Sequence, residues 1–265
     1  MSAARALPEV TISESGGVRY LHLGTPWVQG AMRMEAPLAI ELEYVRRMMA
    51  WTLFRDPAAV AGAHLVQLGL GTGAIARFCS RRMKMRATVV ELNEAVVGAC
   101  RQWFRLPEPS DVFQLVVADA GRWIADPAQQ GTADVLAVDL YDQDAASPVL
   151  DSAEFYRRCF DALAAGGAMT VNLFGRNASF ETSTRRIAAA FGADAVWTMQ
   201  PTKEGNTVVL AMKQVTFPAA DALARRAQTI ETRWQLPATK WPRMLRPAVG
   251  PGATDQGSSD ARPRA

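Results

Sequence analysis

The chain has 265 residues, 49% of them hydrophobic, with 29 Lys and Arg against 26 Asp and Glu for a formal net charge of +3. This length and composition suit one large core, and the scattered basic side chains argue against a nucleic-acid partner. Three cysteines without paired spacing and two histidines argue against disulfides and a metal site, and no apolar run approaches the roughly 20 residues of a membrane span, so we expect a cytoplasmic protein.

The first predicted element is a small β region within residues 1–37. Residues 10–12 and 18–23 are rich in strand-forming side chains, and the Ser-Gly-Gly sequence between them favours a hairpin turn. The next segment, residues 38–54, carries apolar side chains at helical spacing. It predicts a helix ahead of the next strand.

Strands and helices alternate from residue 64 onward. The predicted strands cover residues 64–68, 87–91, 113–117, 135–139 and 168–173. The predicted helices between them cover residues 74–83, 94–104, 120–125 and 152–164. A helix over 181–191 and strands near 195–199 and 206–212 complete the sheet, with an antiparallel edge. This alternation is typical of an α/β fold with a mostly parallel sheet covered by helices on both faces.

The C-terminal part changes in composition. Residues 219–236 predict a helix, whereas residues 247–265 are rich in Pro, Gly, Ser and Asp and are expected to be disordered. The predicted division of the chain is a β region at 1–37, a nucleoside-binding catalytic domain at 38–216, a helical segment at 217–246 and a tail at 247–265.

The most informative motif follows the strand at 64–68. Its apolar run ends in three alternating glycines, Gly69, Gly71 and Gly73, and Glu91 ends the next strand about twenty residues later. Glycines let the backbone approach a ligand closely, and a carboxylate at the second strand end can accept both hydroxyls of a ribose. The pairing predicts a nucleoside-containing cofactor.

Acidic residues gather where the predicted strands end. In chain order these ends are Gly69 to Gly73, Glu91, Asp119, Asp139 and Asn172. Ligands of open parallel sheets lie beyond this edge. Asp119 alone could cap the following helix. Three acids fall within six residues: Asp139, Asp142 and Asp144. They belong either to a solvent-exposed loop or to an acidic pocket for a cationic substrate.

Several stretches together resemble one known family. They are Gln29, GLGTG, VVELNEAVV, VVADAG, VLAVDLYD and SAEFYRRCFDALAAGGAMTVN. In this order they resemble the spermidine synthases, or polyamine aminopropyltransferases, over residues 18–213. The resemblance implies a Rossmann-like methyltransferase-type fold after a small N-terminal β-hairpin region, decarboxylated S-adenosylmethionine as co-substrate, no metal, and a homodimer.

The resemblance also implies residue roles. Asp139 would be the catalytic base, and Asp142 and Gln29 would contact substrate. Independently of the resemblance, Tyr141 lies inside the acidic segment, so we expect its ring to cover substrate methylenes. The cofactor side would consist of Gly69, Gly71, Gly73, Glu91, Asp119 and Ala120. Glu91 would hold the ribose and Asp119 the adenine amino group. The implied reaction moves an aminopropyl group onto a polyamine such as putrescine and releases methylthioadenosine.

Three positions differ from the family pattern. Thr72 stands where the family's glycine loop usually carries an Asp, and Lys203 stands where the family has a Tyr. The family's tyrosine ahead of the glycine strand has no exact match, although Tyr44 is close to its position. The alternatives are therefore an S-adenosylmethionine-dependent methyltransferase, which Thr72 favours, and a non-catalytic nucleoside-binding homologue. A dinucleotide oxidoreductase would explain the G-x-G-x-x-A pattern at residues 69–74, but the chain shows no hydride-transfer site.

Overall fold

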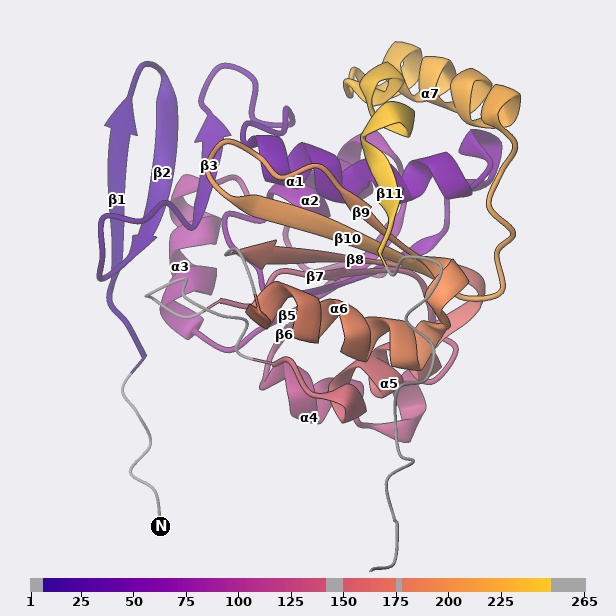
Figure 1. Ribbon diagram of the computed structural model, residues 1–265. Coiled ribbons are helices and arrows are strands. Elements are labelled where there is room, and N and C mark those ends of the chain that lie inside the picture. The colour runs from indigo at the N-terminus through magenta and orange to yellow at the C-terminus, as the bar shows by residue number, and fades with distance from the viewer. Residues whose placement is uncertain (1–6, 142–149, 175–177, 249–265) are drawn as a thin grey trace, which may run out of the picture.

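The computed structural model describes residues 7–141, 150–174 and 178–248, and it contains two sheets (Figure 1). Asp142 and Asp144 lie outside the described residues, and so does most of the predicted C-terminal tail. Within the described part, no helix is long and apolar enough to cross a membrane. The division of the chain into four segments stays a prediction.

The smaller sheet has three antiparallel strands. They are β1 (Val10–Ser15), β2 (Val18–Leu23) and β3 (Gly30–Arg33). Gly16 and Gly17 form the turn between β1 and β2, with φ of +56° and +75°, values that glycine adopts without strain. The predicted hairpin is confirmed. The third strand was not predicted, because four residues are too few to show an alternating pattern.

The larger sheet has the order β11-β9-β10-β8-β7-β4-β5-β6. Its parallel strands are β4 (His64–Leu68), β5 (Arg86–Glu91), β6 (Phe113–Val117), β7 (Ala133–Val138) and β8 (Leu163–Phe174). Its antiparallel edge consists of β9 (Val196–Met199), β10 (Asn206–Met212) and β11 (Leu245–Pro247). The predicted Rossmann-like architecture is confirmed. Because the chain winds outward from β4 in both directions, its carboxyl end is the switch point where such folds bind ligands.

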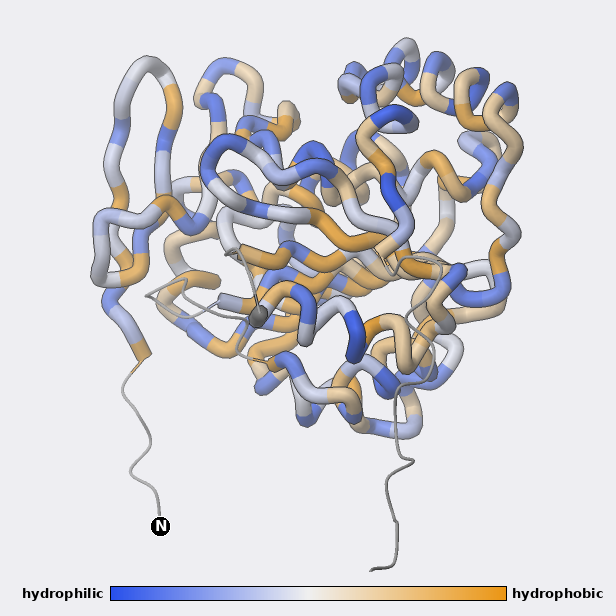
Figure 2. The backbone as a smooth tube through the Cα atoms, viewed as in Figure 1, coloured by the Kyte–Doolittle hydropathy of each residue, from blue (hydrophilic) through white to orange (hydrophobic). Residues whose placement is uncertain are grey.

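Helices cover both faces of this sheet. They are α1 (Glu43–Met48), α2 (Ala74–Arg77), α3 (Glu94–Trp103), α4 (Ala120–Ile124), α5 (Ala153–Ala162), α6 (Ala178–Phe191) and α7 (Ala220–Trp234). The helices contribute to two apolar clusters, one on each face of the sheet. Helices α1, α2, α3 and α7 pack on one face, and α4, α5 and α6 pack on the other. Figure 2 shows hydrophobic residues concentrated along the strands between these layers.

Two predicted helices change type along their length. The helix predicted at 38–54 begins only at Glu43 and continues after Met48 as a 3-10 helix, and the helix predicted at 74–83 continues after Arg77 as a π-helix. All six residues of the 3-10 segment are buried. A segment that is apolar on every side follows the surrounding packing, so its periodicity does not fix the helix type.

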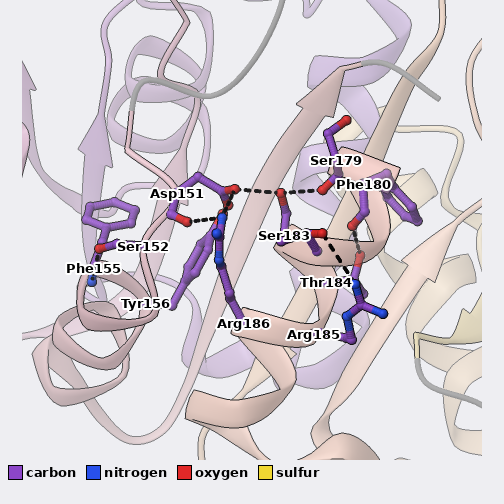
Figure 3. A network of polar contacts seen from close by, with 11 residues as sticks. Asp151, Ser152, Phe155, Tyr156, Ser179, Phe180, Ser183, Thr184, Arg185 and Arg186 are labelled. Atoms are coloured by element: carbon purple, nitrogen blue, oxygen red, sulfur yellow. Dashed lines mark hydrogen bonds and ion pairs between the residues drawn. The ribbon is translucent and has the colours of Figure 1, made fainter. Parts of the chain in front are cut away.

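A polar network joins α5 to α6 (Figure 3). The Asp151 carboxylate accepts hydrogen bonds from the Tyr156 hydroxyl at 2.8 Å, the Ser183 hydroxyl at 2.9 Å and Arg186 Nη1 at 2.6 Å. Ser152 caps α5 by accepting from the Phe155 N–H. The network therefore fixes the chain just ahead of α5 against the neighbouring helix.

Candidate active site

The glycine loop after β4 is shaped by contact with the end of β7. A Cβ placed on Gly69 would lie 2.2 Å from the Asp139 carbonyl oxygen, and Gly69 has φ of +87°. Gly71 and Gly73 also have positive φ, at +53° and +69°. Glycine is therefore required here both by backbone conformation and by the close approach of Asp139.

Glu91 lies at the end of β5, beside this loop. Its Oε2 accepts a hydrogen bond from the Leu70 N–H at 2.9 Å, and its Oε1 accepts from the Asn93 N–H at 2.8 Å. Burial raises the pKa of this carboxyl, and these backbone N–H groups oppose the rise. Each oxygen has a second lone pair, so the carboxylate can still accept from ribose hydroxyls. That role stays a prediction.

Asp119 caps α4 and follows β6. Its Oδ1 accepts a hydrogen bond from the Arg122 N–H at 2.8 Å, and Ala120 behind it is buried. The capping role considered from the sequence is therefore present. Binding of the adenine amino group by Asp119 stays a prediction.

Asp139 is the partly buried carboxylate at the end of β7. The Tyr44 hydroxyl donates to its Oδ2 at 3.2 Å, and Asn172 Nδ2 donates to its Oδ1 at 2.9 Å. Desolvation raises the pKa of Asp139 to about 6, and both hydrogen bonds oppose the rise. Both donors are neutral, and none of the ion pairs between described residues includes Asp139.

A chain of amides extends from Asp139 across the sheet. Asn206 Nδ2, on β10, donates to Asn172 Oδ1 at 3.1 Å, which orients the Asn172 amide so that its NH2 faces Asp139. Sequence reasoning placed Asn172 at a strand end without giving it a role, and it missed Asn206. Both are asparagines in buried strands, and that composition was the available signal.

Tyr141 uses its hydroxyl within the protein. The hydroxyl donates to the Asn172 carbonyl oxygen at 2.9 Å and accepts from the Phe174 N–H. It therefore fixes the end of β7 to β8, which leaves only the ring for the predicted substrate contact. The predicted amine ligand Asp142 lies outside the described residues.

A small cavity connects these elements. Its lining residues come from β3, α1 and the residues just ahead of them, from β4, the glycine loop and α2, and from the end of β7: Gln29, Gly30, Ala31, Leu42, Tyr44, Val45, Gln67, Leu70, Gly71, Thr72, Ala74, Ile75 and Asp139. Thus Gln29, Gly71 and Asp139, predicted separately, share one cavity. None of the described lining residues is Lys or Arg. Lys203, the unexpected cation of the sequence, is exposed and does not line the cavity.

Thr72 is fixed by the small sheet. Its hydroxyl donates to the Ala31 carbonyl oxygen at 3.3 Å, and its side chain lies against Gly30 so closely that a Cβ there would come within 2.5 Å of Thr72 Cγ2. The glycine loop and β3 are therefore packed together. Thr72 contributes no charge to the cavity.

Comparisons with known proteins agree with this arrangement. A family model described as "Spermine/spermidine synthase domain" matches residues 63–221. Two "Polyamine aminopropyltransferase" proteins match over 236 residues, 88% of this chain and of each relative: that of Chromobacterium violaceum at 31% identity and that of Neisseria meningitidis serogroup B at 30%.

Solved structures show a similar fold. A probable spermidine synthase from Corynebacterium glutamicum superposes with a TM-score of 0.68 at 19% identity, covering 96% of this chain and 95% of that one. Human methyltransferase-like protein 13, in complex with SAH, superposes with a TM-score of 0.65 at 22% identity, covering 74% of this chain and 93% of that one.

Proposed function

The chain belongs to the spermine/spermidine synthase family, and on this premise we propose that it is an aminopropyltransferase that uses decarboxylated S-adenosylmethionine and a small polyamine such as putrescine. One observation carries the proposal. Asp139, a partly buried carboxylate held by two neutral donors, lines a cavity whose described lining contains no basic side chain. Such a cavity suits a cationic amine.

Asp139 would act as the general base. The amine nitrogen attacks the propyl carbon next to the sulfonium, a C–N bond forms, and the C–S bond breaks with its electron pair moving to sulfur. Methylthioadenosine leaves, and the proton from nitrogen passes to Asp139. A pKa near 6 keeps this carboxylate ionised at neutral pH while making it a better base than an ordinary Asp.

The neighbouring residues would position the reactants. Tyr44 and Asn172 hold one oxygen each of the Asp139 carboxylate, which fixes its direction toward the cavity. Glu91 and Asp119 would bind the ribose and the adenine. Gln29 lines the cavity from the small sheet.

The alternative is a methyltransferase that uses intact S-adenosylmethionine. Thr72 favours it, because the neutral hydroxyl is bonded to Ala31 and offers no carboxylate to an aminopropyl ammonium. The cavity argues for the decarboxylated form, because the carboxylate of the intact molecule would lack a counter-ion among the described lining residues.

Calorimetric titration tests the proposal. The purified protein would be titrated with decarboxylated S-adenosylmethionine, intact S-adenosylmethionine and methylthioadenosine, each with and without putrescine. We expect preference for the decarboxylated form and release of methylthioadenosine once putrescine is added. Preference for the intact form would support the methyltransferase, and nucleoside binding without turnover would support a non-catalytic homologue.

The variant Asp139→Asn tests the assigned base. Turnover should fall by at least about 100-fold, because the base is removed, while methylthioadenosine affinity stays near that of the wild type. Asp126→Asn is the matched control, since Asp126 is an exposed capping residue that does not line the cavity. Near-normal turnover in Asp139→Asn would contradict the mechanism. The homodimer and the cytoplasmic location stay predictions.

A further inference from the structure

Gln67 is a buried polar side chain in the middle of β4. It is 3% exposed, and its Nε2 donates to the Gly69 carbonyl oxygen at 2.7 Å and the Leu70 carbonyl oxygen at 3.3 Å. Its Oε1 is buried and has no hydrogen-bond partner among the described residues. An unpaired carbonyl oxygen in a core strand is costly and calls for a physical reason.

The orientation of this amide is determined by its neighbours. Rotating it by half a turn would place Oε1 against the carbonyl oxygens of Gly69 and Leu70, which can only accept hydrogen bonds. The NH2 group must therefore face the glycine loop. The atom left without a partner is a hydrogen-bond acceptor.

The same side chain lines the cavity that contains Asp139. Its polar neighbours there include Gln29, Tyr44 and Thr72. The Tyr44 hydroxyl donates to Asp139, and the Thr72 hydroxyl donates to Ala31, so neither proton is available to Gln67. The Gln29 amide does not donate to Oε1 either, since Oε1 has no partner among the described residues. A ligand that satisfies Oε1 in this arrangement brings its own N–H or O–H group into the cavity.

We propose that Gln67 Oε1 accepts a hydrogen bond from the primary ammonium of a bound substrate, and that Gln67 is a specificity-determining residue for an amine beside Asp139. The proposal rests on the proposed function. A neutral carbonyl oxygen next to one carboxylate would bind the ammonium without the cost of a second buried negative charge. It would supply the acceptor that Thr72 does not supply.

The test compares ligands that differ by the amine. Methylthioadenosine lacks the aminopropyl group. Gln67→Met should therefore lower the affinity for decarboxylated S-adenosylmethionine by about tenfold, whereas the affinity for methylthioadenosine should stay within about twofold of the wild-type value. Thr170→Val is the control, because Thr170 Oγ1 is also buried without a partner among the described residues but Thr170 does not line the cavity. Neither affinity should change in that variant.

A second titration identifies which ammonium is bound. If Gln67→Met keeps the preference between the two nucleosides but weakens putrescine binding about tenfold in the presence of methylthioadenosine, the bound ammonium belongs to the acceptor. Either loss supports the proposal. An equal loss for methylthioadenosine would overturn it, since Gln67 would then only shape the glycine loop. Unchanged affinities for all ligands would overturn it as well.

Gln67→Glu covers the case in which Gln67→Met does not fold. The carboxyl introduced by this substitution can, when protonated, donate to the Gly69 carbonyl oxygen and keep a free acceptor oxygen, so the amine preference should survive. Loss of the preference in this variant would contradict the proposal. A wild-type protein that binds methylthioadenosine as tightly as the decarboxylated form and shows no putrescine binding would instead refute the proposed function itself.

Discussion

Burial gives Asp139 two opposing effects. The same desolvation that raises its pKa to about 6 makes it a stronger base and also makes its ionised form costly to the folded protein. The hydrogen bonds from Tyr44 and Asn172 offset part of that cost. Activity and stability should therefore respond to this one residue in opposite directions.

The first consequence concerns stability. Because the folded pKa lies above the ordinary value of 3.8, the folded protein binds more protons than the unfolded chain between pH 4 and 6, and the free energy of unfolding falls as the pH rises through this window. At pH 8 the ionised Asp139 should cost up to about 3 kcal/mol. Asp139→Asn should raise the unfolding midpoint in urea at pH 8 and change it little at pH 3.5. Equal effects at both pH values would contradict this.

The second consequence concerns the pH dependence of catalysis. The wild-type kcat/KM should rise with an apparent pKa near 6, as Asp139 loses its proton and becomes a base. The hydrogen bond from Tyr44 lowers that pKa, so Tyr44→Phe should move the rise toward higher pH by about half a unit. Tyr20→Phe, on β2 of the small sheet, is the control. A profile identical in Tyr44→Phe and wild type would show that Tyr44 does not tune the base.

At the scale of elements, the repeating parts of the fold could be predicted and the irregular parts could not. Strands β4 and β6 match their predicted bounds because each is a short, mostly apolar run rich in Val and Leu between polar or turn-forming residues. Strand β11 was missed because it has only three residues and forms only by pairing with β9. Local sequence carries no information about such a partner.

The candidate site divides in the same way. Glu91 and Asp139 could be placed at one sheet edge because parallel strands end together. The contact of Tyr44 with Asp139 spans 95 residues and depends on how α1 packs over the sheet, and the Asn206 contact with Asn172 depends on the antiparallel register of β10. Neither arrangement follows from periodicity.

The Asp151 network gives a prediction about the link between α5 and α6. Asp151→Asn and Arg186→Met should each lower the free energy of unfolding by about 1–3 kcal/mol, because each leaves partly buried polar groups with a missing partner. The double variant should be less destabilised than the sum of the two by roughly 1 kcal/mol. Urea denaturation of all four proteins measures this coupling. Strict additivity would show that the ion pair contributes nothing.

At the scale of the whole molecule, the small sheet is part of the site. The Gln29 carbonyl oxygen lies against Gly71, and Thr72 packs on Gly30. Two further contacts hold the N-terminal region against the two ends of α3: Arg19 Nη1, on β2, donates to the Trp103 carbonyl oxygen at 2.6 Å, and Asn93 Nδ2, at the cap of α3, donates to the carbonyl oxygen of Pro8, just ahead of β1, at 3.1 Å. The N-terminal sheet therefore forms one wall of the cavity.

A single methyl group tests this wall. Gly30→Ala places a Cβ 2.5 Å from Thr72 Cγ2 and 2.8 Å from the Thr72 backbone nitrogen, so β3 must move away from the glycine loop. Methylthioadenosine affinity should fall by about tenfold, measured by calorimetry. Gly98→Ala is the matched control, because no atom lies within 4 Å of its added Cβ and a helix favours Ala over Gly. Equal affinities in the two variants would mean that the sheet is not part of the binding site.

The amide chain from Asp139 through Asn172 to Asn206 has a consequence for how this sequence can diverge. The three side chains come from the residue after β7, from β8 and from β10, and each forms a hydrogen bond with the next. If Asp139 is replaced, Asn172 loses the acceptor that its amide must face, and Asn206 is then no longer needed to orient that amide. If Asn206 alone is replaced, the buried Asn172 amide oxygen loses its hydrogen-bond donor. Selection should therefore act on these positions as one unit, and descendants that keep the reaction should inherit all three together.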